Sequence, residues 1–464
     1  MNATIRWGPP VVALALALAA CIDRELAAPK AEPEKEEQVR FPVELNRNVD
    51  ILFVIDDSLS MEKEQSELTN HFHQMIAALE SLEDGLPNIH LGVISTDLGA
   101  GPHGQGCTAI GKRGLLQSGP RIPGCTPPDG HFISDVELSD GSRERNYSGS
   151  LADTFACIAK LGTNGCGFEQ PLQAMRLALD GTLSWNDGFL RDDALLAVIF
   201  LGDEDDCSAS DISLFDEDDA SIGPAGSFRC FAHGVTCAGA SDPGQPGPRA
   251  GCVARSDSPY LYDVAEFVQF LSSLKTVPKS QILVAGLIAE TEPVEVVLES
   301  SSQGQDKPVL APTCSLGPDD EVGAAPPIRL QAFLEAFPLH RTERICNEDL
   351  SPAVAAIGEF IKNGLNARCI RNPLFDIEPA TPGVQPVCVV EEIRLPNTTD
   401  EQRSLIPVCD NNDDPQSSSA LPCFRIEEDS RCQGTPEMLA VSVYYPNSDV
   451  RDPTTVIDGR CIGQ

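Results

Sequence analysis

The sequence predicts an α/β fold built on a doubly wound, mostly parallel β-sheet, with disulfide-rich insertions and a small β-rich C-terminal module. Three observations support this prediction. Short apolar runs recur along the chain, segments with helical periodicity lie between them, and cysteines gather in long stretches rich in Gly and Pro and in the last hundred residues. Strands that alternate with helices pair in parallel, and the helices then cover both faces of the sheet.

Four apolar runs have the length and composition of buried strands. They are residues 51–55, 90–96, 195–201 and 281–289. Between the first two, residues 62–82 repeat apolar side chains with the 3.6-residue period of an amphipathic helix. Five further helices are predicted at residues 151–161, 169–183, 260–274, 328–337 and 351–365.

Three long stretches interrupt this pattern, at residues 99–149, 207–258 and 300–327. Each is dense in Gly, Pro, Ser or Asp and too long for an ordinary connection, so we expect them to form lobes held by disulfides. Residues 368–464 contain six cysteines and short β-like runs, which predict a small cysteine-rich module. The chain therefore reads as one large, much-inserted domain followed by this module.

The amino terminus has the layout of a secretory signal. Arg6 precedes an apolar stretch at residues 11–20 that is too short to span a membrane, and Leu18-Ala19-Ala20 leads into Cys21. This ending resembles the lipobox of bacterial lipoproteins, which implies a signal peptide at residues 1–20 and acylation of Cys21. An ordinary cleaved signal with an incidental cysteine is the alternative.

Behind this cysteine, few residues could bury a core. Residues 21–47 are rich in Glu, Lys, Ala and Pro, so they are predicted to be the acylated Cys21 and a flexible tether. Ile22 rather than an acidic residue follows the cysteine, which favours the outer membrane of a Gram-negative bacterium. The lipid would be the only membrane attachment, because no other segment is apolar over the length of a membrane-spanning helix.

The number of cysteines indicates an oxidising compartment, and the net charge excludes some classes of binding partner. Setting Cys21 aside leaves 16 of the 17 cysteines, which suits eight disulfides in an oxidising compartment. Zinc is the competing use, but CxxC pairs are absent, and His71 and His73 point to different faces of their predicted helix. The chain carries 33 Lys and Arg against 70 Asp and Glu, a net charge of −37. Bulk electrostatics therefore exclude binding to nucleic acid or to anionic membranes.

Residues 50–61, reading DILFVIDDSLSM, hold the main candidate site. The apolar run ends in Asp56-x-Ser58-x-Ser60, so these three side chains are expected in the loop at the carboxyl end of a strand. That edge is where open α/β sheets bind ligands. One carboxylate and two hydroxyls are hard oxygen ligands, which suit Mg²⁺, or Mn²⁺ or Ca²⁺, better than zinc.

The stretch resembles the first metal-binding motif of von Willebrand factor type A domains, the metal-ion-dependent adhesion site. The resemblance covers about residues 48–367 and implies a Rossmann-like type A domain with metal ligands from three loops. In this family the strand that precedes the third loop ends in an aspartate, and Asp203 matches it. Glu204 stands where the family usually has glycine, so the turn there is expected to differ.

The second loop departs from the family, whose members usually place a threonine ligand at the start of the next helix. Glu169 lies nearest to that position, and Thr163 is the alternative. A glutamate at a helix start can instead interact with the helix dipole alone. If Glu169 ligates, three negative charges face one divalent ion, and the site becomes tighter and less welcoming to an acidic ligand.

Three smaller expectations concern the surroundings of these loops. A disulfide between Cys157 and Cys166 would hold the second loop rigid, although either cysteine could pair elsewhere. Asp97, just beyond a predicted strand, is a weaker candidate for the rim of the site. The acidic runs at residues 203–219 and 409–414 lack the spacing of an EF-hand loop and are predicted to be solvated surface.

These features together are similar to type A domain lipoproteins of Gram-negative bacteria. The function predicted is a cell-envelope protein, anchored by its lipid, that binds an unknown partner protein or extracellular ligand through a metal that bridges to a partner carboxylate. Neither a G-x-S-x-G nor an H-E-x-x-H motif is present, so the chain is not predicted to be an enzyme. The alternatives are a secreted metal-dependent hydrolase and a structural envelope protein whose metal only stabilises the fold.

Overall fold

The computed structural model describes residues 36–42 and 47–463, apart from gaps at 83–84, 105, 139, 225, 240–241, 277, 301–305, 316–322, 366–367, 371, 378–383, 385, 411–414, 430–431, 433–434, 436 and 447–454. The predicted signal peptide and Cys21 lie outside these residues. Within them, no helix is long and apolar enough to cross a membrane.

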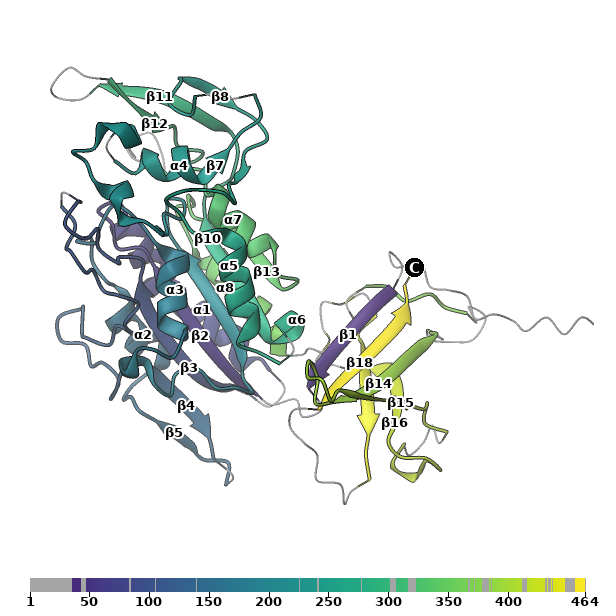
Figure 1. Ribbon diagram of the computed structural model, residues 1–464. Helices are drawn as coiled ribbons and strands as arrows, with labels where there is room; N and C mark the ends of the chain where they lie inside the picture. The colour runs from purple at the N-terminus through teal and green to yellow at the C-terminus, as the bar shows by residue number, and fades with distance from the viewer. Residues whose placement is uncertain are drawn as a thin grey trace, which may run out of the picture.

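A seven-stranded sheet forms the centre of the protein, in the order β13-β10-β6-β2-β3-β4-β5 (Figure 1). The strands are β2 (Asn48–Ile55), β3 (Asn88–Ser95), β4 (Ile133–Glu137), β5 (Arg143–Arg145), β6 (Leu195–Leu201), β10 (Ile282–Ile288) and β13 (His340–Arg344). The five from β13 to β3 are parallel, and only β4 and β5 are antiparallel. The prediction of an α/β protein with a mostly parallel sheet is confirmed, and each of the four predicted strands is present.

Helices pack against both faces of this sheet because the apolar side chains of β2 alternate between them. Ile51, Phe53 and Ile55 join one hydrophobic cluster with α1 (Glu62–Glu80), α2 (Leu151–Ala159) and α8 (Ser351–Leu365). Leu52 and Val54 join a second cluster with α3 (Pro171–Leu179), α5 (Val264–Ser273) and α7 (Ile328–Glu335). All six predicted helices exist, although most are shorter than predicted.

The insertions behave differently from one another. The first is held by two disulfides, as predicted, but it contributes β4 and β5 to the central sheet rather than forming a lobe. The other two combine, because β8 from the second pairs with β11, and β11 pairs with β12. This insertion lobe contains α4 (Phe228–Gly234), β7 (Val235–Thr236), β8 (Gly247–Arg249), β9 (Val253–Ala254), β11 (Val294–Ser300) and β12 (Asp306–Leu310) and lies at the top of Figure 1. Short helical turns complete the main domain at η2 (Ser184–Asn186), η3 (Ile212–Phe215), η4 (Ala220–Ile222) and α6 (Pro278–Gln281).

Eight disulfides join the 16 cysteines, as their number predicted. The pairs are Cys107–Cys166, Cys125–Cys157, Cys207–Cys230, Cys237–Cys252, Cys314–Cys346, Cys369–Cys432, Cys388–Cys461 and Cys409–Cys423. The expected bridge between Cys157 and Cys166 is wrong. The first insertion folds back beside these two cysteines, so each is paired with a cysteine of that insertion.

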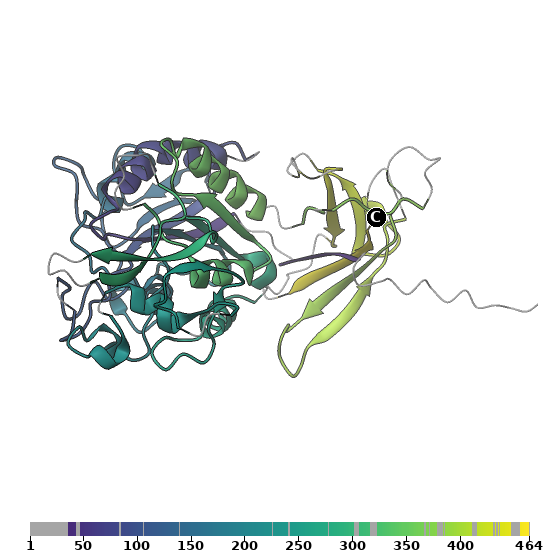
Figure 2. The same ribbon diagram turned by 90° about the horizontal axis from the view of Figure 1, so that it is seen from above.

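The C-terminal module contains strands from both ends of the chain (Figure 2). Its four-stranded sheet has the order β1-β18-β14-β15, with β1 (Glu36–Pro42), β14 (Cys388–Arg394), β15 (Gln402–Ile406) and β18 (Val456–Ile462). A hairpin of β16 (Cys423–Glu428) and β17 (Leu439–Tyr444) accompanies it, with the short turn η5 (Pro415–Ser417). Residues 21–47 are therefore not a tether along their whole length, because β1 pairs with β18 and buries Val39 and Phe41 in the core of the module.

We predict that Phe41→Ala destabilises the C-terminal module by about 3–5 kcal/mol, because it removes a buried ring from a small core. Hydrogen exchange should become faster at the amides of β14 and β18 and stay unchanged at β2 and β6. Gln38→Ala, on the exposed side of the same strand, is the control and should cost only about 1 kcal/mol, because it removes one side-chain hydrogen bond to Asp458. Equal effects of the two substitutions would show that β1 is not part of the module's core.

Candidate metal site at the carboxyl edge of the sheet

The strand register brings three loops together at one edge of the sheet. Ile55 at the end of β2 pairs with Leu201 of β6 on one side and Ser95 of β3 on the other. The first residue of each loop continues this pairing: the Asp56 N–H donates to the Leu201 carbonyl at 2.9 Å, and the Thr96 N–H donates to the Ile55 carbonyl at 3.1 Å. The loops after β2 and β6 therefore emerge side by side.

The first loop presents Asp56, Ser58 and Ser60 as the sequence predicts. The Ser58 N–H donates to Oδ1 of Asp56 at 2.7 Å, and the two serine hydroxyls lie 3.1 Å apart. Ser60 in turn makes a side-chain hydrogen bond with Asp203 of the third loop. A continuous line of polar groups thus connects Asp56 to Asp203.

Gln65, on α1, fixes the first loop against the second. Its buried side-chain amide donates to the Asp56 carbonyl at 2.8 Å and to the Gly162 carbonyl at 3.0 Å. The Gly162 N–H donates back to the Gln65 side-chain oxygen at 3.0 Å. The helix that follows Asp56-x-Ser58-x-Ser60 therefore also positions the start of the second loop.

The second loop brings Glu169 rather than Thr163 to the cluster. Glu169 is buried, lies next to the N-cap residue of α3, and makes a side-chain hydrogen bond with Glu204. Its carbonyl accepts from the Cys207 N–H at 2.8 Å, which joins the second loop to the third. Thr163 is half-buried, and in the described part of the chain no hydrogen bond links its hydroxyl to this cluster.

The third loop divides its four acids between two tasks. Asp203 and Glu204 belong to the cluster, whereas Asp205 accepts from the backbone N–H groups of Arg329 and Leu330 at 2.9 and 3.0 Å and so caps α7. The acidic run at residues 203–219 is predicted to be solvated surface, whereas Asp203 itself is predicted to be a metal ligand. The surface prediction is wrong at Asp206, which is fully buried.

Asp206 is the structural anchor of this loop. Its carboxylate pairs with the Arg329 guanidinium at 3.0 Å, and neither side chain is exposed. The same carboxylate accepts from the Ser208 hydroxyl at 2.5 Å and from the Leu172 N–H of α3 at 3.2 Å. Removing one partner of such a buried pair is costly, because the remaining charge has no compensation.

The acids of the cluster raise one another's pKa. Burial, followed by the charge of Asp203, raises the pKa of Asp56 well above its usual value. Burial and the Glu204 carboxyl do the same for Glu169. Burial and the Glu204 charge raise the pKa of Asp203 to about 7, although Ser60 opposes the shift. Protons or a cation are needed to relieve this repulsion.

No basic side chain within the described residues forms an ion pair with Asp56, Glu169, Asp203 or Glu204. Lys112 contacts Asp57 instead, and its Nζ lies 3.8 Å from the Asp97 carboxylate. Asp97 also accepts from the Gly99 N–H at 2.8 Å. Asp97 is therefore engaged by Lys112 and its own turn, beside the cluster rather than in it.

The donor set fits a hard divalent cation. Oε1 of Glu169 and Oδ1 of Asp203 are buried oxygen atoms without a hydrogen-bond partner, which is costly unless something else binds them. No three carboxylates of this cluster bring their oxygens within 4.8 Å of one another in the described structure. Mg²⁺ does not require that, because it is usually held by one or two carboxylates and keeps several waters. The hydroxyls of Ser58 and Ser60 would complete such a set.

A pocket of about 570 Å³ opens beside the cluster. Glu169 and Glu204 form part of its wall, and the insertion lobe forms much of the rest with Phe228, Phe231 and Leu310. Acidic groups at one side therefore meet an apolar surface at the other. A ligand bound at the edge of the sheet would contact both.

The sequence predicts five of the residues that meet here, Asp56, Ser58, Ser60, Glu169 and Asp203, but not the role of Glu204. In the sequence Glu204 is only a departure from a family glycine, whereas this side chain connects Glu169 to Asp203 electrostatically. Glu64, in the first turn of α1, also raises the pKa of Asp203. The sequence contains a signal for both glutamates. Glu204 directly follows Asp203, and Glu64 lies four residues after Ser60, so each is close in sequence to a predicted ligand.

No protein-family model and no curated protein matches the sequence. Among solved structures, the chain is similar to a von Willebrand factor type A protein from Catenulispora acidiphila, with 9% identity and a TM-score of 0.30 over 93% of this chain and 62% of that one. It is also similar to the pilus adhesin RrgA from Streptococcus pneumoniae, with 8% identity and a TM-score of 0.27 over 92% of this chain and 58% of that one.

The chain thus spans less than two thirds of the length of either structure. TM-scores this low do not assign it to a family, so its function has to be inferred from the site.

We predict that the metal-free protein loses stability as the pH rises from about 4 to about 7. The raised pKa of Asp203, about 7, means that the folded state binds more protons than the unfolded state in this window, and each deprotonation adds a buried charge. Urea unfolding in EDTA at several pH values would measure the effect. Asp203→Asn should flatten the slope, and a slope as steep as that of the unmodified protein would contradict the assignment.

Proposed function

We propose that this protein is a binding module that holds one divalent cation at the carboxyl edge of its sheet and captures a partner protein or extracellular ligand there. One observation carries the proposal: buried carboxyl groups from three loops meet without a basic partner among the described residues, and two of their oxygens are left without a hydrogen bond. A divalent cation would relieve both defects. In this proposal the chain has no catalytic activity.

The roles of the residues follow from their positions. Asp56 and Asp203 would supply the charge that binds the ion, and Ser58 and Ser60 would supply neutral oxygens between them. Glu169 would complete the set from the second loop, with Glu204 hydrogen-bonded behind it. Mg²⁺ is the preferred ion because all these donors are hard oxygens; when bound, it would supply positive charge and an open coordination position to a partner.

The charges also bear on the partner. Asp56, Glu169, Asp203 and Glu204 together can carry four negative charges against two on the ion. A partner carboxylate would therefore enter a site that remains negative, which weakens the carboxylate bridge expected from the family resemblance. A neutral or basic group is favoured at this edge, and the apolar wall formed by the insertion lobe would accept the rest of a side chain or peptide.

The fold is compatible with a type A domain. β2, the first strand of the sheet, lies at its middle, β3 follows on one side, and β6, β10 and β13 follow in order on the other. This reversal of direction is what a doubly wound sheet has, and the cluster lies beside it, where such sheets bind ligands. We therefore retain the type A interpretation of residues 48–367 as part of the proposal.

Metal binding tests the proposal directly. We expect the disulfide-bonded protein to bind one equivalent of Mg²⁺, Mn²⁺ or Ca²⁺ in calorimetric titrations. Asp56→Ala should lower the affinity by roughly 100-fold or more, and Glu169→Ala by at least about tenfold, since loss of a residue that only supports a ligand already costs about 10- to 100-fold.

Asp57→Asn is the matched control for this titration. Asp57 is buried next to Asp56, but its side chain accepts from Ser95 and Lys112 rather than facing the cluster. This variant should bind the ion as the unmodified protein does. Unchanged affinity in Asp56→Ala would eliminate the site, whereas unchanged affinity in Glu169→Ala would remove only that residue from it.

We further propose that the module is displayed in the cell envelope, anchored through a lipid on Cys21, in the outer membrane of a Gram-negative bacterium. The basis is the Leu18-Ala19-Ala20-Cys21 ending of the apolar stretch, together with eight disulfides that suit an oxidising compartment. The partner would then be met outside the inner membrane.

Cys21→Ser should move the protein from the membrane fraction to the soluble fraction, because the acylated residue would be lost. Fractionation with immunoblotting measures the shift, and mass spectrometry of the unmodified protein should find a lipid on its amino-terminal peptide. Absence of that lipid would exclude the lipoprotein interpretation without affecting the metal site.

A further inference from the structure

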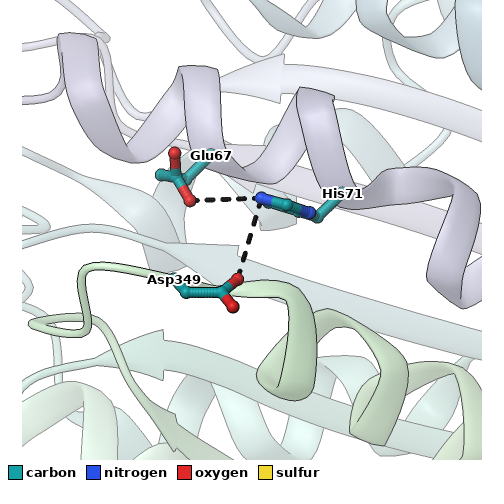
Figure 3. Close-up of side chains that lie close together, drawn as sticks. All are labelled: Glu67, His71 and Asp349. Atoms are coloured by element: carbon teal, nitrogen blue, oxygen red, sulfur yellow. Dashed lines mark ion pairs between the residues drawn. The ribbon is translucent and has the colours of Figure 1, made fainter.

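A second group of metal-ligating side chains lies on the face of the sheet covered by α1 and α8. Glu67 and His71 project from α1, and Asp349 approaches them from the loop before α8 (Figure 3). Nε2 of His71 lies 3.4 Å from a Glu67 carboxylate oxygen and 3.7 Å from an Asp349 carboxylate oxygen. Within the described residues this is the one group of three or more His, Cys, Asp or Glu whose ligand atoms all lie within 4.8 Å of one another.

These separations match a tetrahedral metal. Zinc binds imidazole nitrogen and carboxylate oxygen at about 2.0–2.2 Å, which places neighbouring ligand atoms about 3.3–3.5 Å apart. The separations from His71 Nε2 to Glu67 and to Asp349, 3.4 and 3.7 Å, are close to this spacing, and all three ligand atoms lie within 4.8 Å of one another. One nitrogen and two oxygens also suit a borderline ion such as Zn²⁺ better than Mg²⁺, which prefers oxygen ligands alone.

Two structural features hold the three ligands in place. Glu67 and His71 are four residues apart on a helix, so their side chains lie on the same face. The Asp349 carboxylate accepts from the Ser351 N–H at 2.8 Å, which fixes it at the start of α8, and the Cys314–Cys346 disulfide pins the loop three residues earlier. Both helices also pack in the same hydrophobic cluster. The ligands are therefore presented by elements whose relative position is already set.

We propose that Glu67, His71 and Asp349 form a zinc site that joins α1 to the loop before α8, separate from the cluster at the carboxyl edge. Three protein ligands leave a fourth position, which water fills, since the Asp349 side chain is 66% exposed. The bound ion connects α1 to the loop before α8. Because α1 carries Gln65, which contacts the first and second loops, the ion also stabilises the position of these loops.

The alternative is that Glu67 and His71 form an ordinary ion pair on one helix, and that Asp349 only accepts a hydrogen bond at the start of α8. Such a pair contributes only a few tenths of a kcal/mol and binds no metal. Zinc binding itself therefore separates the two interpretations. Because Zn²⁺ can also occupy acidic oxygen sites, the titration has to be made in excess Mg²⁺, which occupies the carboxyl-edge cluster if that cluster binds metal.

The experiment uses the untagged, disulfide-bonded protein, titrated with Zn²⁺ by calorimetry and followed by thermal unfolding. We expect one equivalent to bind with a Kd in the micromolar range or below and to raise the Tm. His71→Ala should abolish this binding, and Glu67→Gln and Asp349→Asn should each weaken it at least tenfold. Co²⁺ should give the visible absorption of tetrahedral coordination in the unmodified protein and lose it in His71→Ala.

His73→Ala is the matched control, because His73 lies on the same helix but its ring is engaged by the Asn70 carbonyl and Gln74. It should bind Zn²⁺ like the unmodified protein. Asp56→Ala should also leave zinc affinity unchanged, which separates this site from the carboxyl-edge cluster. The proposal is overturned if the unmodified protein binds no Zn²⁺, if His71→Ala binds equally well while keeping its Tm in EDTA, or if His73→Ala loses as much affinity as His71→Ala.

Discussion

The arrangement of this domain depends on one electrostatic constraint, the burial of like-charged carboxyl groups where three parallel strands end. Asp56, Asp203 and Glu204 come from two loops that the strand register places side by side, and Glu169 comes from a third loop that hydrogen bonds to Gln65 and to the Thr96 carbonyl hold against them. Burial and mutual repulsion raise the pKa of three of these acids. Such a cluster is destabilising by itself, since each charge loses hydration and, among the described residues, none of these acids forms an ion pair with a basic side chain. A site that is unfavourable when empty gains most from a cation.

The loop after β6 shows how the fold separates acids available to a ligand from acids that only stabilise the structure. Asp205 and Asp206 follow Asp203 and Glu204 directly, yet both are compensated, one by backbone N–H groups at the start of α7 and the other by Arg329. Of these four consecutive acids, Asp203 and Glu204 face other carboxyl groups, whereas Asp205 and Asp206 face hydrogen-bond donors or a guanidinium. Partners, rather than the type of residue, decide which carboxylates remain available to a ligand, so composition alone could not distinguish them.

Much of the central fold follows from local patterns in the sequence. The run at Leu195–Leu201 has no polar residue, which predicts an inner strand, and all seven of its residues are buried. Parallel strands present their carboxyl ends at one edge, and this rule alone places Asp56 near Asp203. The glutamate at position 169 follows from its spacing to the apolar stripe of α3.

Other features depend on contacts between distant segments, which local periodicity does not encode. β1 pairs with β18 across more than four hundred residues, so a stretch that resembles a tether becomes a strand. The cysteine pairs do not follow from the sequence, because 16 cysteines allow very many pairings. The path of the first insertion, for example, selects the partners of Cys157 and Cys166. The helical spacing of His71 and His73 argues against a shared metal site for these two residues. It says nothing about Asp349, which is distant in sequence but lies beside His71 in space.

Two disulfides lie close to the acids at the edge of the sheet. Cys166 lies three residues before Glu169 and is tied to Cys107 of the first insertion, while Cys207 lies four residues after Asp203 and is tied to Cys230 of the insertion lobe. Two of the three loops that carry uncompensated acids are thus held by a disulfide close to those acids, and the Gln65 side chain holds the first loop at Asp56. Without a bound cation, repulsion would favour spreading of the loops, and the disulfides limit how far they can separate. Preorganisation of this kind lowers the ordering cost of binding, so the loops meet an incoming ion already close to the geometry that it requires.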